Sequence, residues 1–103
     1  MIEKRGNNRQ IKSSVLAVEP QATLILNGSY ARGDNRSDSD IDVLILLDKD
    51  QITYEDHKKI SSPLYTIELE TGILISSNFY SKNKWGKRIT PFFENVSREG
   101  ILL

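Results

Sequence analysis

The sequence has no cysteine among its 103 residues. Disulfide bridges, thiolate zinc sites and cysteine nucleophiles are therefore excluded, and the absence suits a reducing compartment. It also has no apolar run near the ~20 residues that a membrane-spanning helix needs, since the longest covers residues 43–47. The first fifteen residues are polar and charged, without the apolar stretch of a signal peptide. We expect a cytoplasmic protein without membrane association.

Neither sign of charge is in excess, because 14 lysine and arginine residues balance 14 aspartate and glutamate residues. This balance argues against strong non-specific binding of nucleic acid, which usually needs a basic surplus. The charges are unevenly placed, with eight acids between residues 34 and 56 and four basic residues between 82 and 88. Trp85 lies inside the basic run, where it either stacks on a base or packs over the edge of a sheet.

The pattern of apolar residues predicts one domain over residues 1–103. Residues 8–18 have the spacing of an amphipathic helix, which Pro20 ends. Two short apolar runs, 23–26 and 41–47, are typical of buried strands. Between them, residues 30–38 are polar and contain Gly33, which indicates a short helical turn followed by a loop.

The second half of the chain is harder to assign. Thr53 is a candidate cap for a helix that runs to about residue 60. Pro63 is a candidate first residue of another helix, which Gly72 ends. Residues 65–69 also alternate like a strand, but we favour the helices. A third strand is expected over 73–80, a short helix over 81–85 and a last helix from Pro91 to Gly100.

Two aspartates open the strand over residues 41–47. Asp40 and Asp42 are two residues apart, so in an extended chain their side chains point to the same side. Two neighbouring carboxylates repel each other and favour a hard divalent cation between them. Magnesium suits such a pair, because one or two carboxylates plus substrate phosphates commonly hold it.

A glycine and a serine end the preceding strand. Gly28 has no side chain, so a phosphate can approach its backbone closely, and a helical turn that begins at Ser29 offers free amide groups to an anion. Arg32 and Arg36 are candidates for charge-assisted contacts to the same phosphates. The sequence therefore predicts a triphosphate cradle beside a metal site, which is the equipment of metal-assisted phosphoryl or nucleotidyl transfer.

The stretch 28–43, GSYARGDNRSDSDIDV, resembles the signature of the DNA polymerase β nucleotidyltransferase superfamily. More closely, it resembles the minimal nucleotidyltransferases of bacteria and archaea. The resemblance implies an α+β fold: a small mixed β-sheet with helices packed mainly on one face. It implies transfer of a nucleoside monophosphate from a nucleoside triphosphate, with ATP the expected donor, to a hydroxyl acceptor. It also implies two Mg²⁺ ions held by three carboxylates, with Asp40 and Asp42 as the first two.

The sequence differs from the family pattern at the third carboxylate. Sister families carry it on the next strand, here residues 73–80, which contains no acid and has Ser76 near the expected place. Glu70 is our candidate for the third metal ligand, and with Asp40 and Asp42 it completes the expected catalytic residues. Glu68 and the absence of any third ligand remain alternatives.

Two functions are consistent with the resemblance. The first is an enzyme whose hydroxyl acceptor lies on another molecule, such as a partner protein. The second is an antitoxin-like binding module with weak or no turnover, paired with a helical partner of the HEPN type. The apolar ending Ile101-Leu102-Leu103 either packs on its own sheet or marks a partner surface, so we expect a homodimer or a helical partner.

Overall fold

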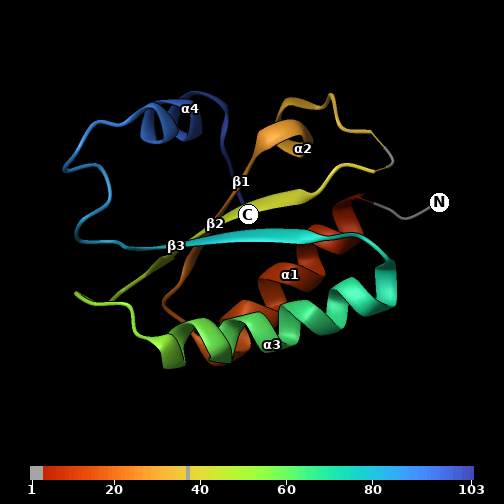
Figure 1. The fold of residues 1–103 in the computed structure, drawn as a ribbon, viewed down its shortest axis with the longest axis horizontal. Coiled ribbons are helices and arrows are strands. Elements are labelled where there is room, and N and C mark those ends of the chain that lie inside the picture. The colour runs from red at the N-terminus through yellow and green to blue at the C-terminus, as the bar shows by residue number, and fades with distance from the viewer. Residues whose placement is uncertain (1–3, 37) are drawn as a thin grey trace.

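A four-stranded sheet separates two layers of helices in the computed structural model, which describes residues 4–36 and 38–103 (Figure 1). The strand order across the sheet is β3-β2-β1-β4. The elements are α1 (Lys4–Val18), β1 (Thr23–Asn27), α2 (Gly28–Arg32), β2 (Ile41–Leu47), α3 (Tyr54–Thr71), β3 (Ile75–Ser81), α4 (Pro91–Glu99) and β4 (Ile101–Leu102). None of the helices within this described part is long and apolar enough to cross a membrane.

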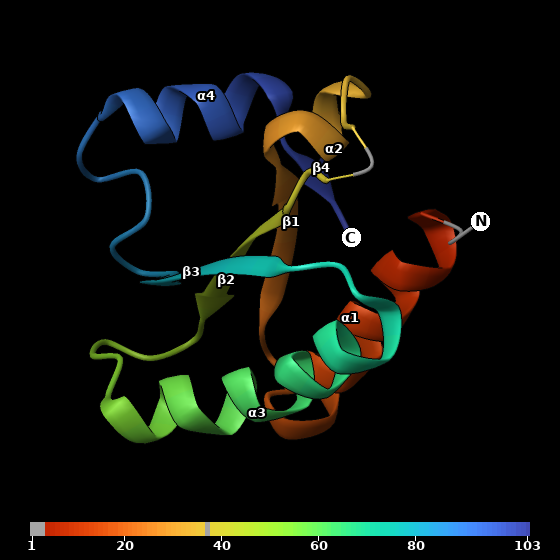
Figure 2. The ribbon, with the colours of Figure 1, turned by 45° about the vertical axis from the view of Figure 1, so that its right-hand side comes forward.

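The sheet is mixed. Strand β1 pairs antiparallel with both β2 and β4, whereas β2 and β3 run parallel and are joined by the crossover helix α3. The two long helices, α1 and α3, cover one face, and the short helices α2 and α4 lie on the other side (Figure 2). The α+β fold with a mixed sheet and helices mainly on one face is therefore confirmed.

The central strand β2 is buried on both faces, which explains its nearly continuous apolar sequence. Its odd-numbered residues belong to the larger core, with side chains of α1 and α3. Leu44 and Leu46 point the other way and form a second cluster with Val96 of α4. Asp42 lies on this second face, and it is the only residue of β2 that is not fully buried. The alternation thus assigns Asp42 to the α4 side of the sheet.

Helix α3 is continuous from Tyr54 to Thr71, so the predicted break before Pro63 is wrong. Proline lacks the amide that the helix interior needs, but apolar side chains on both sides of it, Ile60 and Leu64, are buried against the sheet. This packing holds the helix together across the proline. The alternative strand over 65–69 is also wrong, although Gly72 ends the helix in a left-handed conformation as predicted.

The connection after β3 and the end of the chain also differ from the prediction. A helix predicted over 81–85 is absent: Ser81 ends β3 and residues 82–86 form turns, with the amides of Lys84 and Trp85 donating to the Ser81 carbonyl. Ile101 and Leu102 form strand β4, which pairs with β1. The sequence of β4 gave no sign of a strand. The backbone of these two residues completes the sheet edge, while their side chains remain 45% and 70% exposed.

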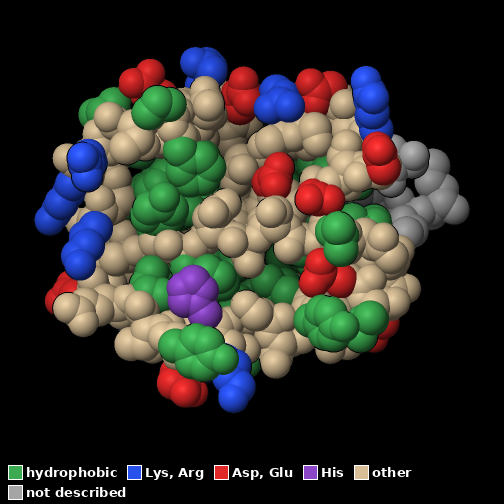
Figure 3. Space-filling model, in the orientation of Figure 1, with side chains coloured by type: hydrophobic (Ala, Val, Ile, Leu, Met, Phe, Trp, Pro, Cys, Tyr) green, Lys and Arg blue, Asp and Glu red, His purple; other side chains and the backbone are tan. Residues whose placement is uncertain are grey.

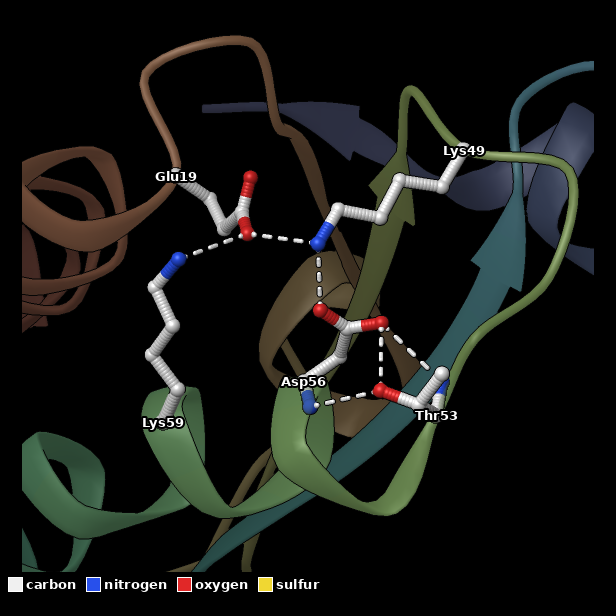
Figure 4. Close-up of polar contacts among 5 residues, drawn as sticks. All are labelled: Glu19, Lys49, Thr53, Asp56 and Lys59. Atoms are coloured by element: carbon white, nitrogen blue, oxygen red, sulfur yellow. Dashed lines mark hydrogen bonds and ion pairs between the residues drawn. The ribbon is translucent and has the colours of Figure 1, made fainter.

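A network of ion pairs fixes the start of α3 (Figure 4). Asp56 accepts from the backbone amide of Thr53 at 2.9 Å, while the Thr53 hydroxyl accepts from the Asp56 amide, which makes a capping box. Lys49 bonds to Asp56 and lies 3.2 Å from Glu19, which Lys59 also contacts at 3.0 Å. The hydrogen bonds from Lys49 and Thr53 lower the pKa of buried Asp56 to about 2.

We predict that Thr53→Ala lowers the free energy of unfolding by about 1 kcal/mol, because it removes the side-chain cap of α3. The matched control is Thr66→Ala on the exposed surface of the same helix, which should not destabilise because alanine has the higher helix propensity. Chemical denaturation measures both. Equal losses in the two variants would contradict the capping role.

The same cap predicts a pH dependence. The native pKa of Asp56, about 2, lies below its ordinary value of 3.8, so its stabilisation is present above pH ~4 and is lost as the pH falls towards 2. Asp56→Asn should lack this part of the acid transition. Superimposable pH profiles of unfolding for the two proteins would exclude the contribution of this carboxylate.

Candidate active site

The backbone of Gly28 and the carboxylate of Asp42 lie in direct contact. Gly28 begins α2 with a positive φ of 71°, which favours glycine. A β-carbon built on Gly28 would overlap Oδ2 of Asp42 and lie 3.1 Å from its Cγ. Position 28 therefore excludes a side chain for two independent reasons, and the carboxylate occupies the space that a side chain would need.

The strand register extends this contact into a row of polar residues. Asn27, the last residue of β1, is opposite Asp42, and Ser76 of β3 is the parallel partner of Asp42 on the other side. Residues paired across neighbouring strands share a face, so the three side chains lie on the α4 side of the sheet. Carboxylate, amide and hydroxyl oxygens are ligands that a hard cation prefers.

Asp42 carries a charge that its surroundings do not fully compensate. Its pKa is raised mainly by burial, then by repulsion from Asp40, while Arg32 acts in the opposite direction. Asp40 itself is exposed at the mouth of β2. A cation or a positively charged group bound between the two carboxylates would stabilise their ionised forms. This electrostatic situation suits a divalent metal site.

The loop before Asp40 is shaped by a turn between Arg36 and Ser39. The Arg36 amide donates to Ser39 Oγ at 2.7 Å, and the Ser39 amide donates to the Arg36 carbonyl at 3.1 Å. The Arg36 side chain is exposed and forms no ion pair within the described part of the chain. It is therefore available to an anionic ligand.

Arg32 connects α2 to α4. Its guanidinium contacts Asp34 at 3.1 Å and Glu99 at 3.4 Å, and these acids raise its pKa. A cavity of about 140 Å³ opens beside it, lined by Gly28 on one side and Asn95 of α4 on another. A phosphate at Gly28 would compete with two acids for Arg32. Among the residues that the structure describes, Arg36 is the one of the two predicted arginines without an ion pair.

Glu70 lies away from the two aspartates. It belongs to α3, on the opposite face of the sheet from Asp42, and accepts a hydrogen bond from Gln10 of α1 at 3.2 Å. Glu68 accepts from the amide of Ile75 at 3.0 Å and so holds the start of β3. Over residues 4–36 and 38–103, no three His, Cys, Asp or Glu side chains gather as a metal site.

Sequence reasoning did not place Asn27 in the site, and it found Ser76 only as the position of a missing acid. Asn27 lies just beyond the strand predicted over 23–26, but the structure makes it the last residue of β1. Its position next to Gly28 was the available signal. The pairing of Ser76 with Asp42 depends on a parallel register, which no local pattern specifies.

Comparison with known proteins finds similar sequences and a similar fold. A family model described as "Nucleotidyltransferase domain" matches residues 8–96. Two proteins of Methanocaldococcus jannaschii, each named "Putative protein adenylyltransferase", are similar to this chain. One is 40% identical over 78 residues, which cover 76% of this chain and 74% of that protein. The other is 36% identical over 81 residues, which cover 78% and 75%.

A solved structure described as "Crystal structure of the toxin-antitoxin with AMP-PNP" has the same fold. It superimposes with a TM-score of 0.64, and the match covers 93% of this chain and 71% of that one. The sequence identity is 20%, so this likeness concerns the fold alone.

We predict that Gly28→Ala destabilises the fold more than Gly33→Ala does. Both glycines have positive φ, 71° and 83°, so each substitution incurs a backbone cost of about 1–2 kcal/mol. Only the methyl group at position 28 meets the Asp42 carboxylate, whereas position 33 faces open space. The overlap should add a further ~1–3 kcal/mol.

A double-mutant cycle isolates this overlap. In an Asp42→Ala background, Gly28→Ala should cost no more than Gly33→Ala, because the carboxylate that it meets is gone. Denaturant unfolding of the single and double variants measures the coupling. An unchanged cost of Gly28→Ala in that background would show that Asp42 does not occupy the space above Gly28.

Proposed function

Because this chain belongs to the nucleotidyltransferase domain family, we propose that it transfers the nucleoside monophosphate of ATP to a hydroxyl group on a partner protein. The observation that carries this proposal is the contact between Gly28 and Asp42, which brings the glycine of the motif and one of its two aspartates to one point. ATP as donor and a protein as acceptor are supported by the names of the two similar proteins from Methanocaldococcus jannaschii.

In this proposal Gly28 and Ser29 receive the phosphates. The Asp42 carboxylate fills the space above Gly28, so a phosphate would approach the chain beside that carboxylate, where the Ser29 hydroxyl and Arg36 add donors. Asp40 and Asp42 hold Mg²⁺, which would neutralise phosphate charge and polarise the α-phosphoryl group. Ser76 faces Asp42 and is a further oxygen ligand for the same ion.

The reaction exchanges one phosphorus–oxygen bond for another. The acceptor hydroxyl oxygen bonds to the α-phosphorus while the bond to the bridging oxygen breaks, and pyrophosphate leaves. The hydroxyl proton passes to a carboxylate of the site or to water. The chain's own task is to align the triphosphate on Gly28 beside the two carboxylates.

A protein acceptor is consistent with the outer surface of α3. Tyr54, Tyr65 and Leu69 are 76%, 60% and 68% exposed, and their spacing puts them on one side of the helix. Exposed apolar residues in a row are typical of a surface that another protein covers. We propose a helical partner of the HEPN type there, with a second copy of this chain as the alternative.

The absence of an acid from β3 favours a second candidate function. With Ser76 opposite Asp42, the chain would bind nucleotide and metal but turn over slowly, as an antitoxin-like binding module. The two functions share the site and differ only in turnover.

A labelling experiment tests the proposal. The tagged chain is purified with its copurifying proteins and incubated with ATP labelled at the α-phosphorus and Mg²⁺. We expect label on a protein, loss of that label by at least 100-fold in Asp42→Asn, and little change in the control Glu70→Gln, whose side chain bonds to Gln10. Asp42→Asn should melt no lower than wild type, since it removes a half-buried charge that Asp40 repels.

The outcomes separate the candidates. ATP binding without label in the wild type would favour the binding module. Loss of label in Glu70→Gln would return Glu70 to the metal site. Undiminished labelling by Asp42→Asn would contradict the proposed site altogether.

A further inference from the structure

A second hollow lies on the same side of the sheet as Asp42, beyond the end of β3. Its volume is about 460 Å³. We call it the Trp85 hollow, after its central residue, and its lining includes the aromatic and basic residues Tyr80, Lys84, Trp85, Lys87, Arg88 and Phe93. Figure 3 shows hydrophobic side chains gathered beside the loop between β3 and α4, with Lys and Arg side chains along the adjoining margin.

The walls of the hollow are preformed. The Ser81 carbonyl accepts from the amides of Lys84 and Trp85 at 3.1 and 2.9 Å, and the Lys87 amide donates to the Lys84 carbonyl at 3.2 Å. Gly86 then turns the chain with a φ of 85°, and a β-carbon there would lie 3.1 Å from the ring of Phe93. Two consecutive turns therefore hold the loop in place before any ligand binds.

The aromatic side chains form a platform. The Trp85 ring lies 5.2 Å from the rings of both Tyr80 and Phe93, measured between centroids. Trp85 is only half-buried and Tyr80 remains 42% exposed, although both belong to this cluster. An indole held by its neighbours, with part of its surface open, is suited to stacking on a planar ligand.

The basic residues at the hollow are unpaired. Lys84, Lys87 and Arg88 are exposed, and none of them forms an ion pair with any residue in 4–36 or 38–103. By contrast, Lys82 of the same basic run donates a hydrogen bond to the carbonyl of Gln21, which lies just before β1. Lysine is depleted at protein–protein interfaces, so the two free lysines favour an anionic ligand over a protein surface.

We propose that the Trp85 hollow binds a nucleotide unit, with its base stacked on the indole and its phosphate held by Lys84, Lys87 and Arg88. Aromatic stacking combined with positive charge is how proteins bind single nucleotides of a strand without reading sequence. The hollow is separate from the Gly28 site, because Tyr80 follows Ser76 by four residues, or about 13 Å of strand. This inference goes beyond the proposed function and stands without it.

Two kinds of ligand contain such a nucleotide unit: a free mononucleotide and the end of a single-stranded oligonucleotide. The balanced charge of the whole chain argues against strong binding to nucleic acid in general, but the hollow is locally basic. The two kinds of ligand are therefore compared directly in the experiment.

Trp85 is the only tryptophan of the chain, so all tryptophan fluorescence originates in the hollow. The protein is titrated with AMP, and separately with a short oligoadenylate, in EDTA to remove divalent metal. We expect saturable quenching, weakened at least tenfold by the double variant Lys87→Glu and Arg88→Glu. The matched control is Lys12→Glu on α1, an exposed lysine of the opposite helical layer, which should bind like wild type.

Each outcome decides the proposal. Tighter binding of AMP identifies a free nucleotide, and tighter binding of the oligonucleotide identifies a strand end; both support the hollow. No quenching by either ligand overturns it, as does equal binding of inorganic phosphate, which would show an anion patch without stacking. Asp42→Asn should leave the quenching unchanged. If it abolishes quenching, the nucleotide binds at the Gly28 site and the proposal fails, whatever the result of the labelling experiment.

Discussion

The space above Gly28 is the constraint on which the site depends. Only a glycine leaves room there for the Asp42 carboxylate, and only the antiparallel pairing of β1 and β2 brings these residues together. The positive φ of Gly28 then directs the chain from the end of β1 into α2. One backbone position thus sets the start of a helix and the place of a carboxylate.

The two faces of the sheet have different tasks. The face towards α1 and α3 carries the main core, where apolar side chains of these two helices and of strands β1 and β2 are buried together. The other face is only partly covered by α2 and α4, so it keeps the polar row at Asp42 and the aromatic hollow at Trp85. Glu70 is separated from Asp42 because it belongs to the first face. A chain of this size thereby leaves one face available for ligands.

Much of this arrangement could be predicted from local patterns. The strand over 41–47, the helical caps at Thr53 and Gly72, and the junction at Gly28 each have a local signal that the structure confirms. What could not be predicted depends on contacts distant in sequence. Burial of Ile60 and Leu64 overrides Pro63, and backbone pairing alone makes β4 from an exposed pair of residues. The face to which an acid of α3 belongs likewise follows from the parallel crossover, which periodicity does not reveal.

Manganese, which replaces magnesium at oxygen sites, tests the central claim most directly. Bound Mn²⁺ broadens the NMR signals of nearby amides, so a titration of the ¹⁵N-labelled chain with ATP present locates the metal. The account predicts that the amides of Gly28, Asp42 and Ser76 broaden first, and that this selectivity disappears in Asp42→Asn. Broadening centred on Glu68 and Glu70 of α3, with the Gly28 signals unaffected, would contradict it.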